Sequence, residues 1–402
     1  MAVQLIYKLH IITLLDSICF GLTYPFLSTY IQSLGADHVV VGVLSIGYLI
    51  CNLISDDLVY LTKVNQRQSG MVIILFITML THFSLIVTSS YWFIIFGRCV
   101  YSIVANQSQN MCKDLLHRHA EPSMKDDHLT IFSILSGSGY IIGPMFAGYL
   151  FEIGFLYIGL LAVLLTLINI CLATTISLSD NTSKENSNER TVLDKLYRNV
   201  NSIVSDCRNC QYKKNWDMMA IKFLHVSCIM IFYGKFSQIL KHNYQSSPVI
   251  VGNTYAYMNS LTFLGTYFAV IAKDWYASFS PVTLAENSFR YLGLCLLVAC
   301  YSPIYLMYMK MCIPIVLLST FIDSIWRDLF ATRKEESLAR LDNPLKTAAG
   351  LITPVAFGVL CNTIGHHAVI IFSVIPAIAS MYIITLYTKN PDSSSEADKK
   401  NE

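Results

Sequence analysis

The chain has 402 residues, of which 54% are hydrophobic and 13% are charged, with a formal net charge of +2 and a mean hydropathy of +0.51. Because soluble globular chains carry about a quarter charged residues, this composition excludes a soluble domain and indicates that lipid is the solvent. The small net charge gives no sign of a nucleic-acid partner. No globular segment gathers a nucleophile, a base or metal ligands, so we expect neither an enzyme, a metal site nor a cofactor.

Twelve apolar stretches fill almost the whole chain, and each is about long enough to cross a bilayer as a helix. A backbone exposed to lipid must satisfy its hydrogen bonds internally, so all of them are expected to be α-helical. The predicted segments are 9–33, 38–60, 70–88, 91–112, 128–151, 154–178, 216–239, 248–272, 289–309, 311–330, 346–364 and 367–388. We therefore predict an all-α membrane protein with twelve transmembrane helices in two pseudo-symmetric six-helix bundles.

The basic residues predict the orientation of the chain, because Lys and Arg stay on the cytosolic side during insertion. They are absent or sparse in every second turn and gather in the alternate turns, most densely between Lys184 and Lys214. Both termini and the central loop are therefore expected in the cytosol. The sequence does not distinguish the plasma membrane from an endomembrane.

A polar stretch near the middle of the chain divides the twelve segments into six and six. It begins rich in Ser and Asn and continues with apolar residues at helical spacing, which favours a short helix on the membrane surface; a disordered linker is the alternative. The predicted domains are an N-terminal bundle at 1–178, a linker at 179–215, a C-terminal bundle at 216–390 and a disordered tail at 391–402.

Asp16, in the first segment, is the leading candidate for a functional group. A carboxylate at the centre of a transmembrane helix costs roughly 2.5–3.5 kcal/mol on insertion scales, so intramembrane acids are functional candidates by default. Burial favours the protonated acid, whereas the substrate or a nearby cation favours the carboxylate, so Asp16 can exchange a proton for a cationic or polar solute. The alternative is a structural or solvated acid near the cytosolic end of the helix.

Arg98 is the second intramembrane charge, about one-third of the way across segment 91–112 and on the same helical face as Tyr101. Its guanidinium must meet a carboxylate, carbonyls or water. We interpret it as a proton-relay or gating partner of Asp16, with contact to an anionic substrate group as a further option. A fixed structural clamp within the N-terminal bundle is an equal alternative.

Two segments in corresponding positions of the halves share a pattern of small residues and proline. Residues 139–148 read GYIIGPMFAG, and residues 349–358 read AGLITPVAFG, so Pro144 and Pro354 fall in register. Gly139, Gly143 and Gly148 remove side chains and allow close helix approach, while a proline frees a backbone carbonyl and permits a bend. The match indicates an internal repeat, as in secondary transporters that rock about a midplane site.

The C-terminal half offers fewer candidates. His225 can titrate near neutral pH, although a hydrogen-bonded structural histidine is the alternative. Lys222 is predicted to snorkel to the cytosolic interface, and Asp323 is predicted to pair with Arg327 four residues on. A CxxC motif at 207–210 has no second pair and no nearby His, so it does not predict a metal site.

The first segment, ITLLDSICFGLTYPFLSTYIQSLGA, contains Asp16, Gly21 and Pro25 and resembles the first helix of the major facilitator superfamily. It resembles in particular the drug:proton antiporter branch, which includes the tetracycline exporters. SGSGYIIGPMFAGYL resembles the glycine-rich signature of that branch, and Gly97-Arg98 matches its intramembrane arginine. Among eukaryotic members the chain most resembles the major facilitator superfamily domain-containing protein 9 group.

The chain departs from this family in the loop after its second segment. The family's loop normally reads like GxLxDRxGRR and latches the two halves, but Val64 stands where the acid is expected and only Arg67 remains nearby. Asp56 and Asp57 can supply a substitute charge for the cytosolic gate, for example to Lys346, or they can simply reach the interface. The segment 70–88 also lacks the carboxylate of the tetracycline exporters, so a tetracycline-like substrate is not supported.

The resemblance implies a monomeric secondary transporter of a small organic solute that works by alternating access, and we expect proton-coupled antiport. A non-transporting scaffold or receptor that retains the fold is one alternative, motivated by the altered loop. A facilitative carrier without ion coupling is another. The expected partners are the solute, protons and the lipid bilayer.

Overall fold

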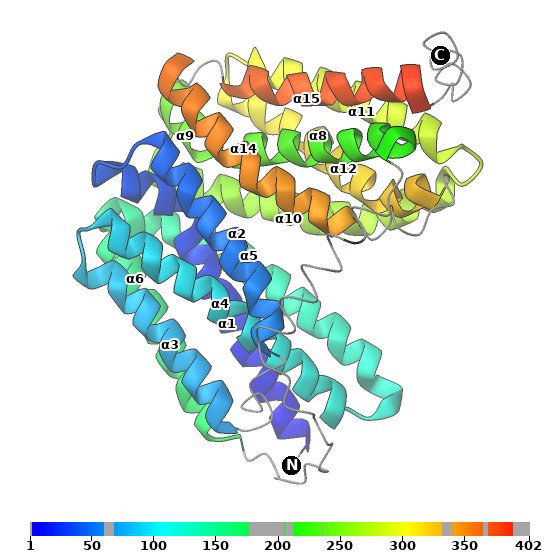
Figure 1. The fold of residues 1–402 in the computed structure, drawn as a ribbon. Coiled ribbons are helices and arrows are strands. Elements are labelled where there is room, and N and C mark those ends of the chain that lie inside the picture. Colours follow the sequence, from blue (N-terminus) through cyan, green and yellow to red (C-terminus); the bar gives the residue numbers. More distant parts are fainter. Residues whose placement is uncertain are drawn as a thin grey trace. The chain divides into compact units, whose positions relative to one another are not determined.

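The structure is a computed structural model that describes residues 2–59, 68–176, 205, 212–234, 236–331, 338, 341–364 and 369–388. These residues are helical apart from short turns, and no strand occurs among them (Figure 1). The first half holds α1 (Ala2–Ser33), α2 (His38–Val59), α3 (Gln68–Val87), α4 (Tyr91–His119), α5 (Lys125–Ile153) and α6 (Phe155–Thr174), with the short 3-10 helix η2 (Pro122–Met124) before α5. The second half holds α8 (Tyr212–Gly234), α9 (Phe236–Asn243), α10 (Pro248–Trp275), α11 (Pro281–Cys300), α12 (Tyr305–Ala331), α14 (Asp342–Ile364), α15 (Val369–Ile383) and the π-helical turn η4 (Ile384–Thr388).

Each of the twelve predicted segments corresponds to one of these helices, with α8 and α9 sharing the seventh segment and α15 and η4 the last. Within the described residues, eight helices are long and apolar enough to cross a membrane, and α2 and α15 contain shorter apolar stretches. The remaining two, α4 and α10, are interrupted by polar side chains such as Gln107, Ser108 and Asn253. Gln107 and Ser108 are buried, so these two polar side chains of α4 face the protein interior.

One predicted boundary is wrong. The sequence analysis placed the break between the ninth and tenth segments at Lys310, whereas α11 ends at Cys300 and α12 begins at Tyr305. The start of α11 explains the difference: the hydroxyl of Ser280 accepts a hydrogen bond from the backbone of Thr283 (3.2 Å), and Pro281 occupies the first turn, where its missing N–H costs nothing. The charge of Lys310 is carried on an exposed face of α12.

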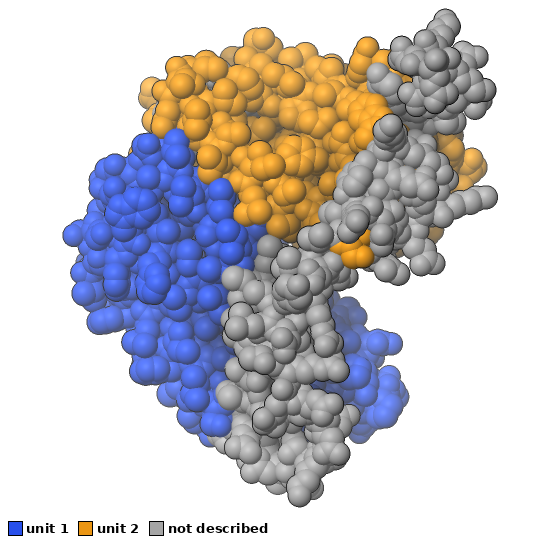
Figure 2. All heavy atoms as spheres, viewed as in Figure 1, with its two compact units in different colours: residues 1–198, 246–259 blue, residues 199–245, 260–402 orange. Residues whose placement is uncertain are grey.

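The chain forms two compact units, which Figure 2 shows in different colours. Unit 1 comprises residues 1–198 and 246–259, and unit 2 comprises 199–245 and 260–402. The beginning of α10 therefore packs with the first six helices, although its later turns belong to unit 2. The predicted linker at 179–215 lies outside the described residues except for 205 and the first turn of α8, and so does the predicted tail at 391–402.

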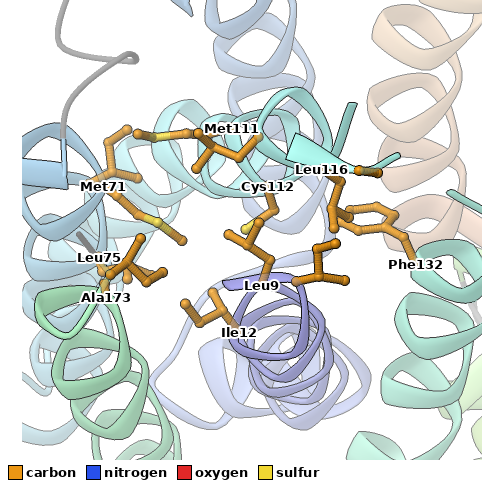
Figure 3. Packing of buried hydrophobic residues seen from close by; sticks show 14 of the residues in the cluster. Leu9, Ile12, Met71, Leu75, Met111, Cys112, Leu116, Phe132 and Ala173 are labelled. Atoms are coloured by element: carbon orange, nitrogen blue, oxygen red, sulfur yellow. The ribbon is translucent and has the colours of Figure 1, made fainter. Parts of the chain in front are cut away.

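One end of unit 1 is held by a large apolar cluster contributed by five helices (Figure 3). Its members include Leu9 and Ile12 of α1, Met71 of α3, Met111 of α4 and Phe132 of α5. The side chains of Leu9 and Ile12 turn from α1 toward this cluster, which leaves the next turns of the same helix to carry polar groups. The packing fixes the rotation of α1 about its axis and hence the direction of Asp16.

Candidate functional site

Asp16 lies inside unit 1, on the turn of α1 that follows the apolar cluster. Its side chain is buried, with the residue only 3% exposed, and it interacts with the hydroxyl of Ser108 on α4. Within the described residues, no Lys, Arg or His lies within 4 Å of its carboxylate. The acid therefore points inward rather than into lipid, and none of the described residues of this unit serves as its counter-ion.

Beside Asp16, a polar chain connects three helices of unit 1. The Ser17 hydroxyl of α1 lies 3.1 Å from that of Ser136 on α5. The amide nitrogen of Gln109 on α4 donates to Ser17 (3.5 Å) and to the hydroxyl of Tyr140 on α5 (3.4 Å). These groups can exchange hydrogen bonds with a polar solute without leaving the interior of the unit.

Aromatic rings surround Phe20, which is one helical turn beyond Asp16 on α1. Phe20 stacks on Tyr24 with ring centroids 5.5 Å apart, and it meets Tyr140 edge to face at 5.3 Å. The rings of Tyr48 on α2 and Tyr101 on α4 both lie 6.4 Å from it. Four helices thus place aromatic faces around one point, an arrangement suited to a planar or apolar part of a ligand.

Arg98 and His82 are both buried, and each lies beside the ring of Tyr101. The guanidinium carbon of Arg98 lies 5.0 Å from the centroid of the Tyr101 ring, and the His82 ring lies at the same 5.0 Å separation. Nη1 of Arg98 and both ring nitrogens of His82 are buried without a hydrogen-bond partner. A cation–π contact is therefore the main compensation that Arg98 finds in the described part of the chain.

The structure does not join Asp16 and Arg98 directly. No ion pair within 4 Å links these two described residues. Instead, Tyr101 interacts electrostatically with both of them. The predicted pairing of acid and arginine within one site is thus replaced by an arrangement in which a phenol stands near each charge.

The crossing of α1 and α5 is built from glycines that the sequence analysis singled out. A Cβ atom added to Gly143 would lie 2.6 Å from the carbonyl oxygen of Ile18 and 2.7 Å from Cα of Gly21. One added to Gly139 would lie 2.5 Å from Cβ of Ser17. Because these distances are far below van der Waals contact, only glycine permits the two backbones to approach this closely.

The prolines of the same motif lie within continuous helices. Pro25 is buried in α1, Pro144 is buried in α5, and Pro354 lies within α14. On the other face of α5, Gly148 packs against the start of α10, where a Cβ on Gly148 would lie 2.8 Å from the carbonyl oxygen of Pro248. Gly148 therefore serves a different contact from Gly139 and Gly143.

The start of α10 adds further groups to the interior of unit 1. The side-chain amide of Asn259 donates to the backbone carbonyl of Tyr140 at 2.7 Å, on the turn of α5 that precedes Pro144. Tyr255 meets Tyr24 edge to face, with centroids 6.4 Å apart. The site in unit 1 is thus made by α1, α2, α3, α4, α5 and the first half of α10.

In unit 2 the structure reveals a charge cluster that the sequence analysis missed. Lys222 of α8 is 0% exposed, so it does not snorkel to the interface as predicted. Its ammonium lies 3.2 Å from Oδ1 of Asp323 on α12 and 3.0 Å from Oδ1 of Asp342 at the start of α14. Asp342 also pairs with Lys346 at 3.0 Å, and the ring of Trp326 lies 4.7 Å from the Lys222 nitrogen.

His225 lies one turn after Lys222 and is 1% exposed. Its Nδ1 accepts a hydrogen bond from the indole of Trp326 (3.4 Å) and lies 3.8 Å from Oδ1 of Asp323. The structure therefore places His225 in unit 2, whereas Asp16, Arg98 and Tyr101 belong to unit 1. Asp323 meets Lys222 and His225; the side chain of its predicted partner, Arg327, lies outside the described residues.

The misplaced start of α11 concealed a second buried acid. Glu286 lies on the second turn of α11, is buried, and pairs with Arg290 at 3.1 Å. It also accepts a hydrogen bond from Thr385 of η4 at 3.4 Å. The Ser-Pro pair at 280–281 is a helix-start signal, and it predicts a helix that contains both Glu286 and Arg290.

The predicted cytosolic gate is not described by the structure. Arg67 and Val64 lie outside the described residues, as do the side chains of Asp56 and Asp57. The CxxC motif at 207–210 also lies outside them. Among the residues that are described, no group of three or more His, Cys, Asp or Glu side chains is arranged to hold a metal ion.

The sequence profile described as the Major Facilitator Superfamily matches residues 9–332. The chain belongs to the Major Facilitator Superfamily. It is therefore a multi-pass membrane transporter with the twelve-helix fold of that superfamily rather than an enzyme, whereas the predicted likeness to the drug:proton antiporter branch remains a prediction.

Solved structures of other superfamily members share this fold. The chain is similar to the crystal structure of the human organic anion transporter MFSD10 (TETRAN), with a TM-score of 0.60, 11% identity, and 95% of this chain and 99% of that chain covered. It is similar to a bacterial homologue of the human lysosomal transporter Spinster, in an inward-facing and unoccupied conformation, with a TM-score of 0.72, 12% identity and 96% of both chains covered. For the nucleoside transporter NupG the TM-score is 0.73, at 13% identity, with 94% of this chain and 98% of that chain covered. No curated protein sequence is significantly similar to the chain.

Proposed function

We propose that this superfamily member is a secondary transporter that moves a small organic solute by alternating access, with proton antiport through Asp16 as its mode of coupling. In this proposal the chain works as a monomer with both termini in the cytosol. Residues 1–178 and 216–390 form its two bundles. The substrates named for the similar structures differ, an organic anion in one case and a nucleoside in another, so at 11–13% identity they do not identify the solute.

The buried, unpaired carboxylate of Asp16 is the observation that carries the proposal. An ionised acid without a counter-ion in a membrane interior is costly, because its hydration is lost and nothing replaces it. Two ligands can remove that cost: a proton, or a cationic or strongly polar group of the solute. Since both occupy the same carboxylate, binding of one favours release of the other, and this competition is what antiport requires.

The neighbouring groups fit this role. Tyr101 interacts electrostatically with both Asp16 and Arg98. A change of charge on the acid therefore changes the electrostatic environment of the arginine through the phenol. Ser108 and Gln109 provide hydrogen-bonding groups near the carboxylate. The rings around Phe20 offer apolar faces for the rest of the solute.

The proposal can be tested with purified protein in liposomes. A thermal-shift screen against a metabolite and drug library identifies a ligand, and its radiolabelled form is then used for counterflow and for uptake driven by a pH gradient. Asp16→Asn should retain counterflow but lose at least about tenfold of the gradient-driven uptake, because an amide cannot carry the proton. Asp126→Asn is the matched control, since Asp126 is an exposed acid in the first turn of α5 and should leave both activities unchanged.

The alternatives give different results in the same assays. An uncoupled facilitator would show counterflow with no response to pH in either the wild type or Asp16→Asn. A scaffold or receptor would bind ligand without flux. Wild-type coupling that survives in Asp16→Asn would refute the role of Asp16 and leave transport itself standing.

A further inference from the structure

One carboxylate oxygen in unit 2 is shared by two basic groups. Oδ1 of Asp323 lies 3.2 Å from the ammonium of Lys222 and 3.8 Å from Nδ1 of His225. The Asp323 side chain is 53% exposed, whereas Lys222 and His225 are 0% and 1% exposed. The aspartate is thus the exposed member of the group, and the two basic side chains are buried.

The hydrogen bonds of His225 define its protonation in this arrangement. The indole N–H of Trp326 donates to Nδ1 of His225, so Nδ1 presents its lone pair and the ring proton resides on Nε2. Nε2 is buried without any partner. The imidazole is therefore neutral here, with an unsatisfied N–H on one side and, on the other, a lone pair that lies close to a carboxylate.

We infer that Asp323, His225 and Lys222 form a second proton-binding site, in which the proton is bound at Nδ1 of His225. A proton from water reaches Nδ1 past the half-exposed carboxylate, an N–H bond forms, and the hydrogen bond from Trp326 is given up. The new imidazolium then donates to Oδ1 of Asp323. This site is separate from Asp16 and does not depend on the coupling proposed for that residue.

Binding of the proton has a consequence for the helices. Among the described residues, the charged groups that face His225 are Lys222 on its own helix, Asp323 on α12, and Asp342 and Lys346 on α14. These are two cations and two anions, so the resting cluster is neutral and gains one positive charge. The imidazolium and Lys222 compete for Oδ1 of Asp323, so protonation weakens the ion pair between Lys222 of α8 and Asp323 of α12. Lys222 then keeps its ion pair with Asp342 of α14.

His82 in unit 1 provides a matched control. It is also fully buried on a transmembrane helix, and both of its ring nitrogens lack a partner. Its charged neighbour, however, is the guanidinium of Arg98, and no carboxylate lies within 4 Å of it among the described residues. Two histidines with equal burial thus differ in that only His225 has a carboxylate beside it, and only His225 is expected to bind a proton.

The test is a pH titration of the protein labelled with nitrogen-15 histidine, in lipid bilayers, followed by solid-state NMR from pH 8 to pH 3.5. The signal that disappears in His225→Gln is expected to change from the neutral to the imidazolium form within this range. The signal that disappears in His82→Gln is expected to stay neutral throughout. A His225 signal that remains neutral down to pH 3.5 would overturn the inference.

Two further variants keep the test decisive even where His225→Gln does not fold. Asp323→Asn removes the anion that receives the new N–H, so the imidazolium signal should be lost over the whole range. Trp326→Phe removes the competing donor to Nδ1, so the imidazolium fraction should be larger at every pH. If neither variant changes the histidine spectrum, His225 is a structural residue and the inference is wrong.

Discussion

Two helix crossings in corresponding places of the halves, α1 with α5 and α8 with α14, are built in different ways. Pro144 of α5 and Pro354 of α14 set the register, so Gly143 corresponds to Thr353. Gly143 packs against Gly21 of α1 with no side chain between the helices, whereas Thr353 hydrogen-bonds to Ser227 of α8 at 2.8 Å. One crossing relies on close backbone contact and the other on a polar side-chain bridge.

The difference extends to the buried charges on the same helices. Asp16 precedes Gly21 by five residues, and Lys222 precedes Ser227 by the same five. Asp16 has no counter-ion among the described residues, but Lys222 meets carboxylates from two other helices. The repeated architecture thus carries an open charge in one unit and a compensated charge in the other, which suits the first to ligand exchange and the second to holding helices together.

The largest expected effect comes from placing valine at the glycine crossing. Gly143→Val should destabilise the protein by about 3 kcal/mol or prevent folding, because the new side chain meets the backbone of Ile18 and Gly21, which cannot rotate away. Thermal unfolding in detergent, with size-exclusion chromatography as a check on folding, measures the loss. A folded variant with wild-type stability would show that the helices can separate here at little cost.

Removing the two charges should sharpen the contrast between the units. Lys222→Met should cost about 2–3 kcal/mol, since it leaves the carboxylates of Asp323 and Asp342 facing each other without their shared cation; their partial exposure moderates the effect. Asp16→Asn should change stability by less than about 1 kcal/mol, because no ion pair is broken. Chemical denaturation of both variants in the same detergent compares them, and equal losses would contradict the assignment of open and compensated charges.

The smallest effect is expected for valine at the corresponding position of α14. Thr353→Val keeps the volume of the side chain but removes the hydrogen bond to Ser227, which should cost about 0.6 kcal/mol, typical of such bonds inside membranes. Ser227→Ala measures the same bond from the other side, and the double variant should lose no more than either single one. A loss as large as that of Gly143→Val would mean that the two crossings are equally intolerant.

Much of the fold follows from the sequence because lipid imposes a simple rule on every spanning segment. The alternation of apolar runs and polar breaks predicts the twelve helices, and the repeated proline and small residues predict which helices correspond. The rule fails where a break is polar but not charged. The break between α11 and α12 consists of Tyr301, Ser302, Pro303 and Ile304, while Lys310 lies inside a helix.

The site could be predicted only in part, for a different physical reason. The sequence singles out Asp16 and Arg98 because each is a charge within an apolar run. It does not reveal that Tyr101 also interacts with Asp16 or that Lys222 bridges α12 and α14, since those contacts join residues distant in the chain. A lone lysine near a helix end has the same appearance in sequence whether it reaches the interface or is neutralised inside.

The glycine crossing also constrains how this protein can vary. Every amino acid that can replace Gly143 is larger, so any change at this codon pushes α1 away from α5, and no compensating reduction is available at Gly21, which already lacks a side chain. Thr353 can be replaced by a smaller or a larger residue. Natural variation should therefore be depleted at position 143 and permitted at position 353, although the two residues occupy equivalent places in the repeat.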